Sequence, residues 1–149
     1  MIKKGWGREA MDEIKICRVG PADAVMLDRL AEDVFNDQIE RDRLTAYLSF
    51  PSSMLVVAID GGLVVGQVKA AIHLHPGKAS DLYIDEVGVT PTHQRRGIAR
   101  RMLAEIERWA RERGCADLWL ATENDNEAAQ ALYAGFARSK PCLLYFWDL

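Results

Sequence analysis

The segment from residue 87 to residue 99 reads Val87-Gly88-Val89-Thr90-Pro91-Thr92-His93-Gln94-Arg95-Arg96-Gly97-Ile98-Ala99. An apolar strand here runs through a short basic loop into a long amphipathic helix. The start of a helix presents unpaired N–H groups and a partial positive charge, which suit a phosphate or pyrophosphate. Gly97 lets the backbone approach an anion closely, and Arg95 and Arg96 add positive charge. We therefore expect a nucleotide-like cofactor at this junction.

The hydrophobic pattern on both sides of this loop predicts alternating strands and helices. The predicted strands cover residues 14–17, 54–59, 63–74, 82–89, 118–121 and 142–147. The predicted helices cover residues 21–35, 40–50, 98–113 and 126–134. This order indicates an α/β fold with a central twisted mixed sheet of about six strands, flanked by about four helices. We expect residues 1–12 to form a flexible leader, within which Met11 is an alternative start, and residues 13–149 to form one domain.

Composition narrows the class of protein. The net charge of −3 disfavours non-specific binding to nucleic acid, and no apolar run approaches the roughly 18 residues of a membrane span. The basic start lacks the apolar segment of a signal peptide. Cys17, Cys115 and Cys142 lie far apart, which is typical of reduced core thiols in a cytoplasmic protein. We expect no metal site, because His73 and His75 share a strand face without an evident third ligand.

Two motifs carry a family resemblance. Residues 94–99 read Gln-Arg-Arg-Gly-Ile-Ala and fit the pattern Q/R-x-x-G-x-G/A. Residues 126–133 read Asn-Glu-Ala-Ala-Gln-Ala-Leu-Tyr and fit N-x-x-A-x-x-L-Y. With both motifs in order, separated by one helix and one strand, the chain resembles the GNAT superfamily of acetyl-CoA-dependent N-acetyltransferases from Ile14 onward. The resemblance implies acetyl-CoA as co-substrate, a primary amine as acceptor, and a homodimer.

The resemblance also implies which residues hold the cofactor. The loop would bind the pyrophosphate, mostly through backbone N–H groups, and the pantetheine arm would insert where two strands diverge. Val87 and Val89, on the strand that enters the loop, are equally compatible with a plain core role. Asn126 is equally compatible with a role as helix cap alone. The implied cofactor-binding residues are Val87, Val89, Gln94, Arg95, Arg96, Gly97, Ile98, Ala99, Asn126, Ala129 and Tyr133.

Glu86 is the candidate general base. Apolar neighbours in the sequence, Ile84 and Val87, should raise the pKa of its carboxyl, which suits proton abstraction near neutral pH. Strand alternation places Leu82, Ile84, Glu86 and Gly88 on one face. Only one of Asp85 and Glu86 can then face a cleft, unless a bulge intervenes. Asp85 and a chain of water molecules remain alternatives for the base.

Tyr133 corresponds in the resemblance to the general acid that protonates the coenzyme A thiolate. A phenol is protonated near pH 7, so it can donate a proton. A tyrosine that only packs the end of the helix against the sheet is the alternative. Ala137 stands where the family usually has glycine, and Gly135 comes two residues earlier, so the exit of this helix should differ.

A narrower resemblance concerns the acceptor. Residues 17–21, 81–89 and 144–146 look like those of the type I aminoglycoside 3-N-acetyltransferases. Acidic residues gather in the segments expected to face the acceptor, and such a rim suits a polycationic amine. The acidic residues are Glu32, Asp33, Asp37, Glu40, Asp42, Asp81, Asp85, Glu123 and Asp125. Two alternatives remain: a transferase acting on a peptide, protein or other small amine, and a non-catalytic acyl-CoA-binding module.

Overall fold

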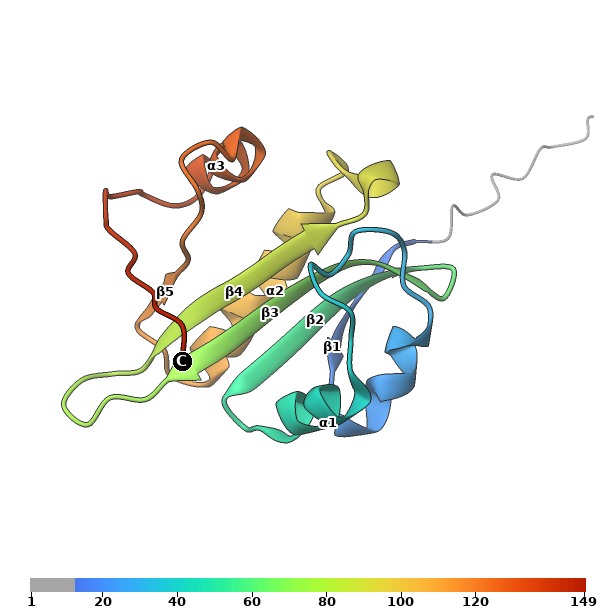
Figure 1. The fold of residues 1–149 in the computed structure, drawn as a ribbon, viewed down its shortest axis with the longest axis horizontal. Coiled ribbons are helices and arrows are strands. Elements are labelled where there is room, and N and C mark those ends of the chain that lie inside the picture. Colours follow the sequence, from blue (N-terminus) through green and yellow to red (C-terminus); the bar gives the residue numbers. More distant parts are fainter. Residues whose placement is uncertain (1–12) are drawn as a thin grey trace, which may run out of the picture.

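A five-stranded sheet forms the centre of the computed structural model, which describes residues 13–149 (Figure 1). The strands are β1 (Lys15–Val19), β2 (Ser53–Asp60), β3 (Leu63–His73), β4 (Asp81–Val89) and β5 (Asp117–Trp119). They lie in chain order across the sheet, with β1 to β4 antiparallel and β5 parallel to β4. The predicted class is therefore confirmed. The predicted leader, with Met11, lies outside the described residues.

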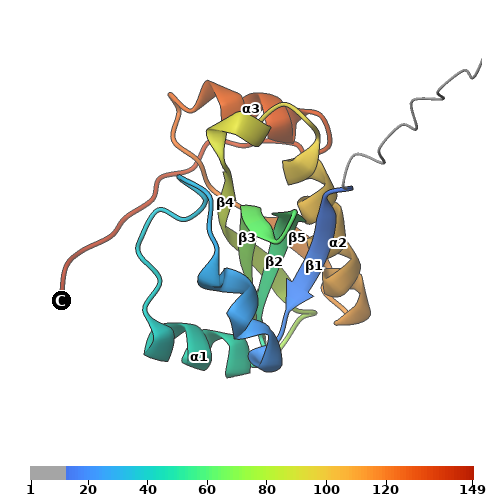
Figure 2. The ribbon, with the colours of Figure 1, turned by 90° about the vertical axis from the view of Figure 1, so that its right-hand side faces the viewer.

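Helices cover both faces of the sheet (Figure 2). They are η1 (Pro21–Asp28), α1 (Arg41–Ser49), η2 (Pro91–His93), α2 (Ile98–Glu112) and α3 (Glu127–Ala134). Helix α2 packs its apolar face on one side, where Met102, Ile106 and Trp109 are almost completely buried. Helices η1 and α1 lie on the opposite side. None of the described helices combines the length and apolar character needed to cross a membrane.

The helix predicted over residues 21–35 is shorter than expected. It ends at Asp28 as a 3-10 helix, and the chain beyond it pairs with β3. The Ala31 N–H donates to the Val64 carbonyl at 2.9 Å, and the Val64 N–H donates to the Arg29 carbonyl at 2.9 Å. These long-range hydrogen bonds outweigh the local helical pattern, because propensity is weaker than tertiary context.

The sixth predicted strand, over residues 142–147, does not form. Its residues are neither helical nor paired, and Leu143 and Phe146 are 80% and 84% exposed. The composition is typical of a strand, but a strand also needs a neighbour to pair with. Cys142 lies in the same segment and is exposed, so the prediction of three core thiols is wrong for this residue.

Candidate functional site

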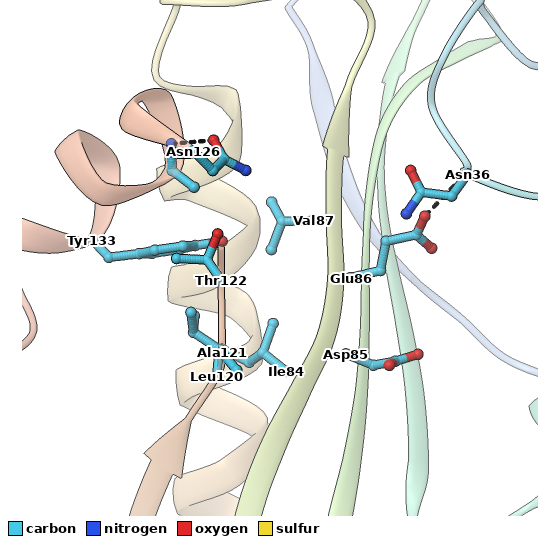
Figure 3. A pocket seen from close by; sticks show the side chains of 11 residues that line it. Asn36, Ile84, Asp85, Glu86, Val87, Leu120, Ala121, Thr122, Asn126 and Tyr133 are labelled. Carbon is cyan, nitrogen blue, oxygen red and sulfur yellow. Dashed lines mark hydrogen bonds between the residues drawn. The ribbon is translucent and has the colours of Figure 1, made fainter. Parts of the chain in front are cut away.

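Strands β4 and β5 diverge and leave a cavity between them. They pair only from Asp81 to Tyr83 on β4, although β4 continues to Val89. The cavity has a volume of about 160 Å³ (Figure 3). It is lined by β4, by the segment that follows β5, by α3 and by the loop after η1. The lining residues are Asn36, Ile84, Asp85, Glu86, Val87, Leu120, Ala121, Thr122, Asn126, Ala129 and Tyr133.

A bulge in β4 determines which way its side chains point. Lys69 pairs with Glu86, and the next residue of β3, Ala70, pairs with Ile84, so Asp85 is the extra residue. Ile84 and Val87 pack in the same core cluster as α2, whereas Asp85 and Glu86 project from the other side of the strand (Figure 3). An extra residue interrupts the alternation of a strand. The expectation that Glu86 shares a face with Ile84 is therefore wrong, and both acidic residues line the cavity.

Glu86 has polar partners in place of the apolar surroundings predicted from its sequence neighbours. Its side chain is 10% exposed. One carboxylate oxygen accepts from the backbone N–H of Asn36 at 2.8 Å, and the other lies 2.8 Å from Lys69 Nζ. Asp85 is 53% exposed and lies 3.5 Å from the same ammonium group. The carboxylate of Glu86 is thus held in one position, while that of Asp85 is largely in solvent.

The segment after η1 reaches Glu86 because β4 has a glycine at position 88. A Cβ on Gly88 would stand 2.2 Å from the carbonyl oxygen of Val34, so no other residue allows this crossing. The same oxygen accepts from Gln67 Nε2 at 3.2 Å. Val34 is 2% exposed and anchors the segment in the core, which places Asn36 two residues later beside Glu86.

Lys69 and Asn36 are the site residues that sequence reasoning missed. Burial by itself lowers the pKa of Lys69, but the hydrogen bond and charge of Glu86, together with Asp85, outweigh burial and raise it. The ammonium group therefore stays charged between the two carboxylates. Lys69 is the only lysine, arginine, aspartate or glutamate in the mostly apolar strand β3, and this was the signal that could have identified it. Nothing in the sequence near Asn36 indicates its contact with Glu86.

Tyr133 reaches the cavity from α3, on the side away from Glu86 (Figure 3). Burial raises the pKa of its phenol above the usual value of 10. The ring packs against the main core and meets the Phe136 ring edge-on, with centroids 6.1 Å apart. The side chain is therefore a protonated donor near neutral pH.

The start of α3 lies beside Tyr133 and also lines the cavity. Asn126 caps this helix, because its side-chain oxygen accepts from the Ala129 N–H at 3.1 Å. The predicted capping role is thus confirmed. The helix ends at Ala134, with the Phe136 and Ala137 N–H groups both donating to the Tyr133 carbonyl.

The loop before α2 leaves the start of that helix open. Gly97 is the N-cap residue, with φ of +76°, and no side chain caps the helix. Beyond Gly97 and its immediate neighbours in the chain, no heavy atom of the described residues lies within 4 Å of where a Cβ of Gly97 would be. Arg95 also has a positive φ of 59°, and both arginines are exposed. Unpaired N–H groups, partial positive charge and free space beside the backbone fit a pyrophosphate group.

Two side chains hold the loop in place. Gln94 Nε2 donates to the Val89 carbonyl at 3.0 Å, and His93 Nε2 lies 2.7 Å from a carboxylate oxygen of Asp60. The His93 side chain is only 15% exposed, so it links the loop to the turn between β2 and β3. Two adjacent residues thus connect the loop before α2 to the end of β2 and to the end of β4.

Comparisons with known proteins agree with this architecture. The model of the Acetyltransferase (GNAT) family matches residues 24–136. An L-2,4-diaminobutyric acid acetyltransferase of Streptomyces coelicolor is 29% identical over 136 residues, which cover 88% of this chain and 78% of that protein. The N-alpha-acetyltransferase RimI of Mycobacterium tuberculosis is 36% identical over 93 residues, covering 61% of this chain and 56% of RimI.

A probable N-acetyltransferase, HLS1 of Arabidopsis thaliana, is 29% identical over 140 residues, or 80% of this chain. The match covers 33% of HLS1, so the chain spans about a third of the length of that relative.

Solved structures share the fold. An aminoglycoside acetyltransferase, HMB0005, from an uncultured soil metagenomic sample superposes with a TM-score of 0.81 at 19% identity, over 92% of this chain and 99% of its own. The enzyme AAC(6')-Iy, in complex with a bisubstrate analogue of coenzyme A, has a TM-score of 0.75 at 18% identity, over 92% and 99% of the two chains. Its designation is of the 6' type, whereas the sequence motifs resemble the 3-N type.

The family model spans well over half of the chain. The sequence motif at residues 126–133 lines the cavity through Asn126, Ala129 and Tyr133, and the motif at residues 94–99 contains the open start of α2. The chain therefore belongs to the GNAT family of acetyltransferases, which use acetyl-CoA.

Proposed function

We propose that this chain is an acetyl-CoA-dependent N-acetyltransferase that acts on a small cationic amine. One observation carries the proposal: a single cavity between β4 and β5 brings together a held carboxylate, Glu86, and a protonated phenol, Tyr133. An acid and a base on opposite sides of one space suit acyl transfer to an amine. A module that only binds acyl-CoA has no need of this pair.

The start of α2 is the proposed site for the pyrophosphate of acetyl-CoA, through the backbone from Gln94 to Ala99 and the charges of Arg95 and Arg96. The pantetheine arm would lie along the part of β4 that diverges from β5, at Val87 and Val89. Asn126 and Ala129 would contact it from the opposite wall of the cavity. Bound there, acetyl-CoA supplies the acetyl group as a thioester.

In the proposed reaction the neutral amine attacks the thioester carbonyl directly. A C–N bond forms and the C–S bond breaks. Glu86 accepts the proton that leaves the nitrogen, directly or through water, and the Tyr133 hydroxyl gives a proton to the departing sulfur. Asp85, which shares Lys69 with Glu86, is the alternative base.

The charges at the cavity favour a cationic acceptor. Asp85 and Glu86 place two carboxylates against one ammonium group, and the exposed Asp37 follows Asn36 directly. Exposed Glu123 and Asp125 lie on the segment that leads from β5 to α3. A net negative rim attracts polycations. Relatives named for diaminobutyric acid and for aminoglycosides support the same class, so an aminoglycoside is the first acceptor to test.

The test is thiol release from acetyl-CoA with three kinds of amine: aminoglycosides, diaminobutyric acid, and a peptide with a free N-terminus. We expect the fastest turnover with an aminoglycoside, and NMR of the product then distinguishes the 3-amino from the 6'-amino group. Fastest turnover with the peptide would favour the RimI-like alternative. Binding of acetyl-CoA without turnover on any amine would contradict the enzyme proposal.

Replacing Lys69 with Met should lower KM for a cationic acceptor. The ammonium of Lys69 competes with that of the acceptor for Glu86 and Asp85, so its removal makes the site more negative. Removing one positive charge beside the carboxylates that would bind the acceptor should lower KM by about tenfold at low salt, and by less at high salt. Lys15→Met, on the exposed start of β1, is the matched control. A higher KM for the Lys69 variant would contradict this account of the acceptor site.

Replacing Gly97 with Glu should weaken binding of acetyl-CoA. The change puts a side chain and a negative charge at an open helix start, at a φ of +76° that disfavours any Cβ. We expect the Kd from calorimetry to rise by about 10- to 100-fold. Gly97→Ala separates backbone strain from charge. Gly77→Glu, at another glycine with free space, is the control and should leave Kd unchanged.

A further inference from the structure

Three aromatic rings stand side by side near the start of β4. Tyr83 lies on β4, Trp119 on β5 and His73 on β3. The ring centroids of Tyr83 and Trp119 are 4.5 Å apart, and the His73 ring lies 6.1 Å from Tyr83 and 5.9 Å from Trp119. Trp119 is 47% exposed and the His73 side chain 45%. We name these three residues the aromatic patch, and adjacent exposed rings of this kind indicate a binding surface.

A single carboxylate holds two of the three rings in place. Trp119 Nε1 donates to Asp81 Oδ1 at 3.0 Å, and His73 Nδ1 lies 3.4 Å from the same oxygen. The hydrogen bond from Trp119 is the largest cause that lowers the pKa of Asp81, so this carboxylate is charged near neutral pH. A ring that is already oriented loses little conformational entropy when a ligand covers it. The patch is therefore prepared for contact before any ligand arrives.

The patch shares a face of the sheet with the candidate base. Leu82 and Ile84 pack in the core cluster of α2, so Tyr83 between them points to the opposite face. Glu86 projects from β4 on that same face, beyond the bulge (Figure 3). The carboxylate and the rings thus lie on one surface, and a ligand can contact both.

The register of the sheet gives the spacing between the two places. On β3, Lys69 pairs with Glu86 and Ala71 pairs with Tyr83, so the two places are two residues apart on that strand. Two residues of a strand span roughly 7 Å. This is about the step from one ring to the next in a linked amino sugar.

The charges differ between the two places. Asp85 and Glu86 share the single ammonium group of Lys69, which leaves an excess of negative charge for a cationic amine. At the patch, Asp81 lies 3.3 Å from Lys78 Nζ, so the two charges there are balanced. The face of an aromatic ring carries partial negative charge, which attracts the partly positive C–H groups of a sugar ring and any ammonium group on it.

The backbone at the patch disfavours an extended peptide as the ligand. From Asp81 to Tyr83, strand β4 is paired with β3 on one side and with β5 on the other. A peptide that binds by strand addition needs a free edge, and β4 has none at this point. The rings themselves are the exposed feature, so a ligand with rings of its own fits the patch better.

We propose that the aromatic patch is a second subsite for the acceptor, where a sugar ring stacks while the neighbouring ring presents its amine to Glu86. This inference rests on the proposed function, because it takes Glu86 as the place where the amine reacts. The acceptor class is then a polyhydroxylated amine of at least two linked rings. A short diamine such as diaminobutyric acid, held at Glu86, does not extend to the patch.

Calorimetry without acetyl-CoA tests the subsite, because it needs no turnover. The probes are tobramycin, which has three linked rings, and deoxystreptamine, which is its central ring alone. Trp119→Ala changes no charge, and we expect it to raise the Kd of tobramycin by about tenfold while the Kd of deoxystreptamine changes less than about twofold. Val25→Ala, at an exposed apolar residue of η1, is the matched control and should change neither value. The Kd of acetyl-CoA should be the same in all three chains.

Each other result of this comparison overturns the subsite. Equal losses for both probes would show that Trp119 acts on the structure of the site as a whole. A tobramycin Kd that Trp119→Ala leaves unchanged would show that the acceptor does not contact the patch, even if acetyl transfer to tobramycin is fast. If Trp119→Ala changes only the sedimentation of the chain, the patch contacts protein. Conversely, ring-dependent binding with no turnover on any amine would contradict the enzyme proposal and leave the sugar-binding patch standing.

NMR of tobramycin bound to the wild-type chain gives a second readout that needs no variant. Protons that lie over an aromatic face are shielded, so those of one terminal ring should move upfield on binding. Deoxystreptamine should show no comparable shift, because it occupies only the place beside Glu86. Absence of the upfield shift for tobramycin would overturn the proposal.

Discussion

Glu86→Gln should reduce kcat for acetyl transfer by about 10²- to 10⁴-fold, which is the usual contribution of a general base. The amide keeps the size of the side chain and can still accept from the Asn36 N–H, but it cannot take up the proton of the amine. Binding of acetyl-CoA should change little, because the carboxylate projects from β4 on the side away from the α3 wall of the cavity. Steady-state kinetics with a saturating acceptor and calorimetry with acetyl-CoA measure the two effects separately.

Asp85→Asn is the matched control for Glu86→Gln. Both carboxylates contact Lys69, but Asp85 is 53% exposed, whereas Glu86 is 10% exposed and also accepts from the Asn36 N–H. We expect only a small loss of kcat in this variant. A large loss in Asp85→Asn with a small loss in Glu86→Gln would assign the base to Asp85. Small losses in both variants would leave a chain of water molecules as the route for the proton.

Tyr133→Phe should lower kcat by about 10²-fold or more and leave the Kd for acetyl-CoA unchanged. The substitution removes only the hydroxyl, and the ring can keep its contacts with the core and with Phe136. Tyr145→Phe, at a tyrosine that is 75% exposed, is the control and should have no effect on turnover. Unchanged kcat in Tyr133→Phe would remove this hydroxyl from the mechanism, and an equal loss of binding and turnover would indicate a structural role.

The raised pKa of Tyr133 adds a pH dependence. A proton donor is present below its own pKa and is lost as the pH rises through it. Since burial raises the pKa of this phenol above 10, kcat should show no basic limb from Tyr133 below pH 10. A basic limb near pH 8 that disappears in Tyr133→Phe would contradict the assignment.

Local features of the fold were predictable from the sequence. The apolar stripe of α2, the glycine at its start and the asparagine cap of α3 each depend on residues within a few positions of one another. Helix propensity, caps and turns act over that same short range, so a pattern in the sequence reports them directly. The two family motifs lie on these local features, which is why the residues of the cofactor region are recognisable in the sequence alone.

The acceptor side of the site was not predictable in the same way. Simple alternation put Glu86 on the face of Ile84 and among apolar neighbours, and the bulge at Asp85 reversed that face. The helix predicted over residues 21–35 gave way to pairing with β3. The strand predicted over residues 142–147 remains without a neighbour. In each case the local preference was present, but pairing with a distant segment decided the outcome.

The sequence by itself therefore determined the α/β class, the open start of α2 at Gly97 and the capped start of α3, because these features arise between near neighbours along the chain. Only the tertiary structure decided that Asp85 and Glu86 face the same way, that Lys69 joins them, and that Asn36 holds Glu86 from 50 residues away. Such contacts follow from strand register and from the crossing over Gly88, and register is set by pairing between distant segments of the chain.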